Sequence, residues 1–293
     1  MFNDNKRLDP SQVQDQRGRS TGQTIALGGG GLGIIVLIIY MLLGGNPADL
    51  TGSGVVNQPS SSGYTQDAGD LATVCQTGAD ANARQDCRIV GFVNSIQAFW
   101  ESEFAKNGMK YSPAQTVLFS GSIQGACGFA SSAMGPFYCP SDQMIYVDLS
   151  FFETVLQQIG AQGGPLAEAY VIAHEYGHHV QNLLGVLDTS GMIRGSGPDS
   201  EIVFIELQAD CLAGVWLHNA TATGYITNLT SEQLAQALNA AASVGDDRIQ
   251  QQTQGYVVPD AWTHGSSEQR LAALQDGLQS GDVNTCNTPG WTQ

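Results

Sequence analysis

The sequence predicts an α+β domain, mostly α with a small sheet, preceded by one transmembrane helix. Three observations support this fold class: an uncharged apolar run over residues 25–43, five later segments with the spacing or capping residues of helices, and two short runs of strand-favouring residues. With 293 residues, the chain is long enough to bury a sizeable core.

The chain is acidic, with 11 Lys and Arg against 27 Asp and Glu and a net charge of -16. Nucleic acid binds basic surfaces, so this charge argues against nucleic acid as a partner. The acidity lies mainly after the apolar run, because Lys and Arg outnumber Asp and Glu in residues 1–24. Solubility alone would also account for the charge.

Residues 25–43 have the composition of a membrane span, since the run lacks charge and approaches the roughly 20 residues that a spanning helix needs. A cleaved signal peptide is the alternative. Such a peptide normally has a shorter apolar region followed by a small-residue cleavage site, and no such site follows residues 25–43. The basic residues ahead of the run place residues 1–24 in the cytoplasm by the positive-inside rule. The expected location is therefore the cell membrane, single-pass, with the large C-terminal part outside. Gly29 and Gly33 have a helix-dimer spacing and suggest a possible homodimer.

Residues 44–70 are rich in Gly, Ser and Pro, and we expect a flexible linker there, followed by one extracytoplasmic domain over residues 71–293. All six cysteines follow the apolar run, which favours disulfides in an oxidising compartment. Free buried thiols or a second metal site are the alternatives, although no C-x-x-C pair favours cysteine-bound zinc. The preferred pairs close two short loops and leave one long connection: Cys75 with Cys87, Cys127 with Cys139, and Cys211 with Cys286.

The domain is expected to be built from helices and two strands. The strands are predicted over residues 116–123 and 144–149, on either side of the Cys127 to Cys139 loop. Capping-box pairs, Thr230 with Gln233 and Ser266 with Gln269, mark the starts of two helices. The predicted helices cover residues 89–104, 165–184, 200–218, 230–244 and 266–278.

An H-E-x-x-H motif over residues 174–178 lies in the second of these helices. At 3.6 residues per turn, His174 and His178 are about 40° apart around the helix axis and one turn apart along it, so both imidazoles can converge on one ion. Glu175 points to the same side and can reach a metal-activated water without being a ligand. The spacing therefore predicts a zinc site with Glu175 as the general base.

A catalytic zinc needs a third protein ligand and one open position. Glu206 and Asp210 are four residues apart in an otherwise apolar helix, where a carboxylate is costly unless it is paired or binds a metal. We expect Glu206 to be the third ligand and Asp210 to orient a ligand histidine.

The chain resembles the bacterial family of neutral zinc metallopeptidases, a gluzincin-like group. The resemblance rests on HEYGHHVQ and ELQADCLAGVW, with further matches at SQVQDQRG, GPFYCPSDQMIYVD and HGSSEQR, and it covers all but the linker well. It implies a gluzincin-like zinc-peptidase domain, Glu206 as the ligand with Asp210 in support, and a bacterial envelope location.

His264 and Arg270 resemble an H-P-x-x-x-x-R-like element of some membrane gluzincins, with Gly265 in place of the proline. The resemblance suggests that His264 stabilises the developing oxyanion and that Arg270 orients Asp210 or Glu206. Capping or surface roles are the alternatives for both. His179 is expected to pack or donate hydrogen bonds rather than bind metal, and His218 to complement a helix C-terminus.

The sequence thus predicts a membrane-anchored peptidase with one zinc ion, endopeptidase rather than exopeptidase, acting on proteins or peptides. The strand over residues 144–149 could bind an extended substrate by edge pairing. A zinc-stabilised envelope scaffold that does not cleave is one alternative, although it would not need Glu175. A zinc amidase acting on a non-peptide substrate is the other.

Overall fold

The structure is a computed structural model that describes residues 1–18, 70–187 and 195–287. Its centre is a four-stranded sheet in which three strands run parallel and the last, at one edge, runs antiparallel. The strand order is β1 (Val13–Asp15), β2 (Gln115–Phe119), β6 (Met144–Asp148) and β5 (Phe137–Cys139). A separate hairpin joins β3 (Ser122–Gly125) to β4 (Gly128–Ser131).

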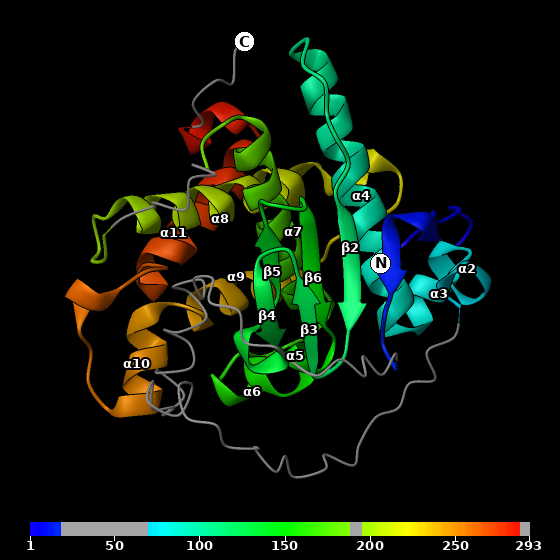
Figure 1. Cartoon of the computed structure of the whole chain (residues 1–293). Coiled ribbons are helices and arrows are strands. Elements are labelled where there is room, and N and C mark those ends of the chain that lie inside the picture. Colours follow the sequence, from blue (N-terminus) through cyan, green and yellow to red (C-terminus); the bar gives the residue numbers. More distant parts are fainter. Residues whose placement is uncertain (19–69, 188–194, 288–293) are drawn as a thin grey trace.

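Helices form the larger part of the described fold, as predicted, and Figure 1 shows α4 and α7 behind the sheet. The long helices are α4 (Gln85–Lys106), α7 (Pro165–Leu183), α8 (Glu201–Asn219), α9 (Ser231–Ser243) and α11 (Ser267–Ser280). The shorter ones are α2 (Leu71–Val74), α3 (Gly78–Ala83), α5 (Ser150–Glu153), α6 (Val155–Gln158) and α10 (Asp246–Gln254). Single 3-10 turns are η1 (Pro10–Gln12), η3 (Ser132–Met134), η4 (Ala220–Thr223), η5 (Pro259–Ala261) and η6 (Val283–Cys286).

Side-chain caps precede three of the predicted helices. Ser200 accepts from the backbone of α8, and Thr230 and Ser266 form capping boxes with Gln233 and Gln269. These interactions satisfy amides that a helix start leaves without a partner. The predicted boundaries of α8, α9 and α11 therefore agree with the structure to within two residues.

The sheet is buried on both faces. Leu118 of β2 faces the large core that includes α4 and α7, whereas Val117 and Phe119 face a smaller cluster with Tyr146. Because both faces are covered, β2 has a nearly continuous apolar run instead of alternation.

Two strand predictions need correction. The strand predicted over residues 116–123 breaks at Gly121, where a φ of +76° turns the chain from β2 into β3. The predicted edge strand, now β6, pairs with β2 on one side and β5 on the other, so it has no free edge for a peptide. The strand at that edge of the sheet is β5, which is too short to show periodicity.

Helices α7 and α8 pack closely because Gly177 stands where they meet. A Cβ atom at this position would lie 2.9 Å from the backbone oxygen of Ala209. Glycine in a helix interior costs about 1 kcal/mol relative to alanine. Here it lets the backbone of α8 approach the helix that contains the H-E-x-x-H motif.

The first 18 residues, termed the N-terminal segment, pack into the same fold as the rest of the described chain. Strand β1 pairs with β2, and Figure 1 shows the segment (blue) beside β2 and near α2 and α3. Phe2 is buried against Phe92, with a ring-centroid separation of 5.0 Å.

Arg17 ties the other end of the N-terminal segment to α4. Its guanidinium lies 3.0 Å from the fully buried Asp86, and Arg84 lies 2.8 Å from the same carboxylate. Burial alone would raise the pKa of Asp86, but the hydrogen bonds from Arg84 and Arg17 outweigh it and lower the pKa. The segment is therefore held by both apolar packing and buried charge pairing.

This packing overturns the predicted membrane topology. A segment that shares a sheet and a core with the rest of the described chain cannot lie on the opposite side of a bilayer from it. No helix within the described ranges is both long and apolar enough to cross a membrane. The fold class is therefore corrected to a mostly helical α+β domain with a small sheet, in which no described helix spans a membrane, and the single-pass location is withdrawn. Residues 25–43, Gly29 and Gly33 among them, and almost all of the 44–70 linker lie outside the described residues.

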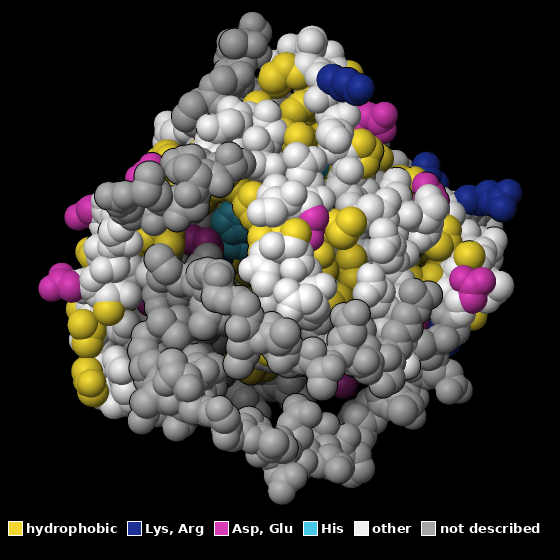
Figure 2. All heavy atoms as spheres, viewed as in Figure 1, with side chains coloured by type: hydrophobic (Ala, Val, Ile, Leu, Met, Phe, Trp, Pro, Cys, Tyr) yellow, Lys and Arg dark blue, Asp and Glu magenta, His cyan; other side chains and the backbone are white. Residues whose placement is uncertain are grey.

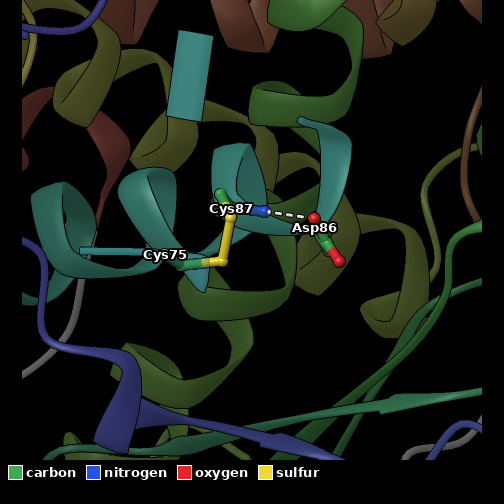
Figure 3. Close-up of side chains that lie close together, drawn as sticks. All are labelled: Cys75, Asp86 and Cys87. Carbon is green, nitrogen blue, oxygen red and sulfur yellow. Dashed lines mark hydrogen bonds between the residues drawn. A yellow bond between two sulfur atoms is a disulfide. The ribbon is translucent and has the colours of Figure 1, made fainter. Parts of the chain in front are cut away.

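The structure forms the three preferred disulfides, Cys75 with Cys87, Cys127 with Cys139, and Cys211 with Cys286. Cys75, Asp86 and Cys87 lie close enough together to suggest a second metal site. Figure 3 shows instead that the two sulfurs are bonded to each other and that Asp86 Oδ1 accepts a hydrogen bond from the Cys87 amide. A disulfide has no thiolate to offer a metal.

Phe2→Ala should lower the free energy of unfolding by about 3–5 kcal/mol, because it removes a buried aromatic ring and leaves a cavity. Denaturant unfolding of the whole chain measures this change. Phe129→Ala is the matched control: Phe129 is 44% exposed whereas Phe2 is 3% exposed, so the control should change stability by about 0.5 kcal/mol or less. Equal effects of the two substitutions would contradict the packing of the N-terminal segment.

Candidate metal centre

Helices α7 and α8 bring three potential metal ligands together. His174 Nε2 lies 3.1 Å from Glu206 Oε2, and His178 Nε2 lies 3.4 Å from Glu206 Oε1. One ligand atom from each residue can be chosen so that all three lie within 4.8 Å of one another. The two histidines come from successive turns of α7, and the glutamate comes from the helix that packs closely at Gly177.

These separations fit a small divalent ion. Zinc bonds of about 2.0–2.2 Å at tetrahedral angles place neighbouring ligand atoms about 3.3–3.6 Å apart. Two imidazole nitrogens and one carboxylate also match the donor set of catalytic zinc sites, which keep a fourth position open. The donor chemistry and the spacing of His174, His178 and Glu206 are therefore both suited to zinc.

The other nitrogen of His174 is held by a buried ionic network. His174 Nδ1 lies 2.8 Å from Asp210 Oδ1, and the Tyr170 hydroxyl donates to the same oxygen at 2.6 Å. Arg270 donates from Nε to Asp210 Oδ2 at 2.8 Å and from a terminal nitrogen to Oδ1 at 3.0 Å. Asp210 therefore contacts the His174 nitrogen that does not contact Glu206. Arg270 donates its hydrogen bonds to Asp210 rather than to Glu206.

Opposite charges set the protonation of this network. Burial would raise the pKa of Asp210, but Arg270 and His174 outweigh it and hold the pKa at about 2. For His174, burial opposes protonation, but the Asp210 and Glu206 carboxylates outweigh it and raise the pKa to about 10. The field around His174 therefore favours positive charge, which a proton or a metal cation can supply.

Glu175 is buried beside the ligands. Burial raises its pKa, opposed by His174 and His178 and by a backbone hydrogen bond from Tyr138 on β5. A carboxylate with a raised pKa holds a proton more readily than one in water, which suits a group that takes up and returns a proton. The sequence motif predicts this position for Glu175, and the structure adds its contact with the edge strand.

The other nitrogen of His178 faces an amide. His178 Nδ1 lies 2.8 Å from Oε1 of the fully buried Gln181. A neutral imidazole that donates from Nδ1 presents the Nε2 lone pair to an ion. Both histidines thus have a partner that can hold Nε2 toward Glu206.

His264 lies near the cluster and is fixed by Asp246. Its Nδ1 is 3.1 Å from Asp246 Oδ1, and Asp246 Oδ2 accepts from three successive backbone amides, of Thr263, His264 and Gly265. Burial opposes protonation of His264, but Asp246 and then Glu206 outweigh it and raise the pKa. Gly265 has a φ of +90°, which the proline of the related element could not adopt.

The other two histidines lie outside the ligand set. His179 Nε2 donates to the Ser112 carbonyl oxygen and Nδ1 accepts from Tyr138, while burial lowers the pKa to about 4. It is a neutral packing residue, as expected. His218 lies near the end of α8, and its Nδ1 contacts the Leu278 carbonyl oxygen of α11.

Sequence reasoning missed Tyr170, Gln181 and Asp246. Tyr170 is four residues before His174, and Gln181 is three residues after His178, so helical periodicity could have identified both as neighbours of the ligands. Nothing in the sequence indicates Asp246, because its contact with His264 depends on how the loop before α11 folds back onto α10.

One face of the molecule is hollowed around histidine and acidic side chains (Figure 2). Histidine side-chain atoms are visible near the centre of the face shown, set back from their surroundings and next to acidic side-chain atoms. Apolar side chains lie beside them.

Known proteins similar to this chain, and the family to which it belongs, were compared with it. The chain is 45% identical to Uncharacterized protein Rv2575 of Mycobacterium tuberculosis strain H37Rv over 255 residues, which cover 85% of this chain and 84% of that protein. It is 38% identical to Uncharacterized protein YpfJ of Escherichia coli K12 over 295 residues, covering 97% of each chain. No solved structure matches. Residues 3–289 match the family described as "Putative neutral zinc metallopeptidase", and the chain belongs to that family.

Proposed function

We propose that the chain is a peptidase that uses one zinc ion, held by His174, His178 and Glu206, with Glu175 as the general base. The observation that supports it most is the convergence of the three ligand side chains beside a buried glutamate. When bound, zinc lowers the pKa of a water molecule and polarises a carbonyl group. The chain's own residues supply proton transfer, orientation and charge.

Glu175 would accept the proton of the attacking water and later deliver it to the leaving amine. General acid-base catalysis needs a group whose pKa is near the working pH, and burial raises the pKa of Glu175 in that direction. Its contact with the β5 backbone holds the carboxylate in place. Glu175 is not needed for binding the metal, so its presence favours hydrolysis over a purely structural zinc site.

His264 would donate a hydrogen bond to the oxyanion that forms at the scissile carbonyl. Asp246 holds the ring through Nδ1 and raises its pKa, so the protonated imidazole can donate from Nε2. Arg270 would act indirectly, by holding Asp210 against His174. Both roles require that the groups be in place before the substrate binds, and buried hydrogen bonds provide this.

Strand β5 offers an edge along which an extended peptide could bind. It pairs with β6 on one side only among the described strands, and Tyr138 of β5 bonds to Glu175. A substrate paired with β5 would therefore pass beside the general base. A site of this kind binds the substrate backbone on both sides of the scissile bond, which favours endopeptidase activity.

Two other functions make different demands on the same residues. A scaffold needs the ligands but not Glu175, and a zinc amidase needs all of them with a non-peptide substrate. Denatured protein and cell-wall fragments, assayed side by side, distinguish peptidase from amidase by which of the two is cleaved.

Glu175→Gln should lower kcat by about 100- to 10,000-fold while one zinc per chain stays bound, since the amide removes the base and keeps the shape. Cleavage of denatured protein and metal analysis measure the two quantities. Glu201→Gln, an exposed position at the start of α8, is the control and should leave kcat unchanged. Full activity in Glu175→Gln would contradict the proposed role.

Glu206→Ala should reduce zinc content below one ion per chain, because it removes one of three ligands. Metal analysis after dialysis against a weak chelator measures the loss. Full zinc content in this variant would remove Glu206 from the proposed ligand set. Removal of zinc from the unmodified chain with a strong chelator should abolish cleavage, and restoring zinc should restore it.

His264→Gln should destabilise the metal-free protein more at pH 5.5 than at pH 9. The folded-state pKa of His264 is raised, so its protonated form stabilises the fold below the unfolded pKa of about 6.5, and this contribution disappears as pH rises through the folded pKa. Denaturant unfolding at both pH values measures the difference. In an Asp246→Asn background the pH dependence of the effect should shrink, and an unchanged dependence would rule out Asp246 as its cause.

A further inference from the structure

The amide of Gln181 can have only one orientation. Its Nε2 lies 2.8 Å from the backbone oxygen of Ile205, which accepts hydrogen bonds and cannot donate them. Nε2 must therefore point to α8, and Oε1 must point to His178. Since Oε1 can only accept, the proton between the two residues belongs to His178 Nδ1. The hydrogen-bond network itself thus fixes the tautomer that leaves His178 Nε2 free to bind metal.

A second buried amide extends this network. Gln181 Nε2 also donates to Gln208 Oε1 at 2.9 Å. The other end of Gln208 donates to two backbone oxygens, of Cys286 at 3.2 Å and of Asn287 at 2.9 Å. Both oxygens are acceptors, so the orientation of Gln208 is fixed for the same reason as that of Gln181.

The far end of the network is tied to a disulfide. Cys286 ends the 3-10 turn η6 and is bonded to Cys211 of α8. Asn287 follows with a φ of +50°, a left-handed conformation that asparagine tolerates. The disulfide holds this turn against the helix that contributes both Gln208 and Glu206.

We propose that Gln181 and Gln208 form a positioning relay that fixes the metal-binding tautomer of His178, and that the Cys211–Cys286 disulfide contributes to zinc affinity by holding the relay's far end. This inference rests on the zinc site proposed above. It assigns Gln181 and Gln208 roles that act only through His178. It also predicts that reduction of the Cys211–Cys286 disulfide weakens zinc binding. The three ligands alone would not predict this effect.

The test measures the zinc dissociation constant of the whole chain by competition with a chelator. Gln181→Met keeps the length of the side chain and removes the acceptor, and should weaken zinc binding by about 10- to 100-fold. Gln208→Met should weaken binding several-fold, because Gln181 retains the Ile205 carbonyl oxygen.

Matched controls distinguish an effect of the relay on zinc affinity from an effect of lower overall stability. Gln97→Met removes another buried glutamine, on α4, and should leave the zinc dissociation constant unchanged even if the protein becomes less stable. The paired variant Cys211→Ala with Cys286→Ala should weaken zinc binding several-fold. The paired variant Cys75→Ala with Cys87→Ala, which removes the disulfide between α2 and α4, should not.

The outcomes distinguish failure of the relay from failure of the proposed function. If the unmodified chain binds one zinc and cleaves peptides, but Gln181→Met and the Cys211/Cys286 pair match their controls in zinc affinity, the relay is wrong and the function stands. If the unmodified chain binds no zinc, both proposals fall. Should Gln181→Met not fold, Gln208→Met and the Cys211/Cys286 pair decide, and affinities equal to those of their controls would overturn the relay.

Discussion

Two carboxylates buried on one helix determine much of this structure. Glu206 and Asp210 are almost inaccessible to solvent on α8, and a buried carboxylate is costly unless positive charge or hydrogen bonds compensate it. Asp210 is compensated by Arg270, Tyr170 and His174, all by direct contacts. Glu206 has instead two imidazoles against it, an arrangement that a bound cation would complete. The same pair of charges thus requires α11 to supply Arg270 and α7 to supply the histidines.

How much of the site could be predicted depended on whether the geometry was local. The relation of His174 to His178 and of Glu206 to Asp210 follows from the helical repeat, so the sequence was enough to group them. The contact of Arg270 with Asp210 spans 60 residues, and only resemblance to a family suggested it. Asp246 was missed because its role depends on a loop that brings three backbone amides to one oxygen.

In the fold, too, local features could be predicted from the sequence and long-range contacts could not. Long helices with capping residues were predicted well, because their signals lie within a few residues of each boundary. Strands β1 and β5 have three residues each and no detectable period, so the order of the sheet could not be predicted. The topology error had one cause: hydropathy gives no information on which later residues pack against Phe2 or Arg17.

The N-terminal segment also constrains the order in which the chain can fold. Phe2 is bridged to Ile226, and the Met1 carbonyl oxygen accepts from the Thr227 amide. During synthesis, Met1 and Phe2 must therefore wait for some of their partners, which emerge more than two hundred residues later. Long-range closure of this kind slows folding, because the entropy of the intervening loop is lost before the contact forms. Until then the site that buries Phe2, formed in part by Phe92, is incomplete, and the growing chain exposes part of an aromatic side chain that a chaperone or a neighbouring nascent chain could bind.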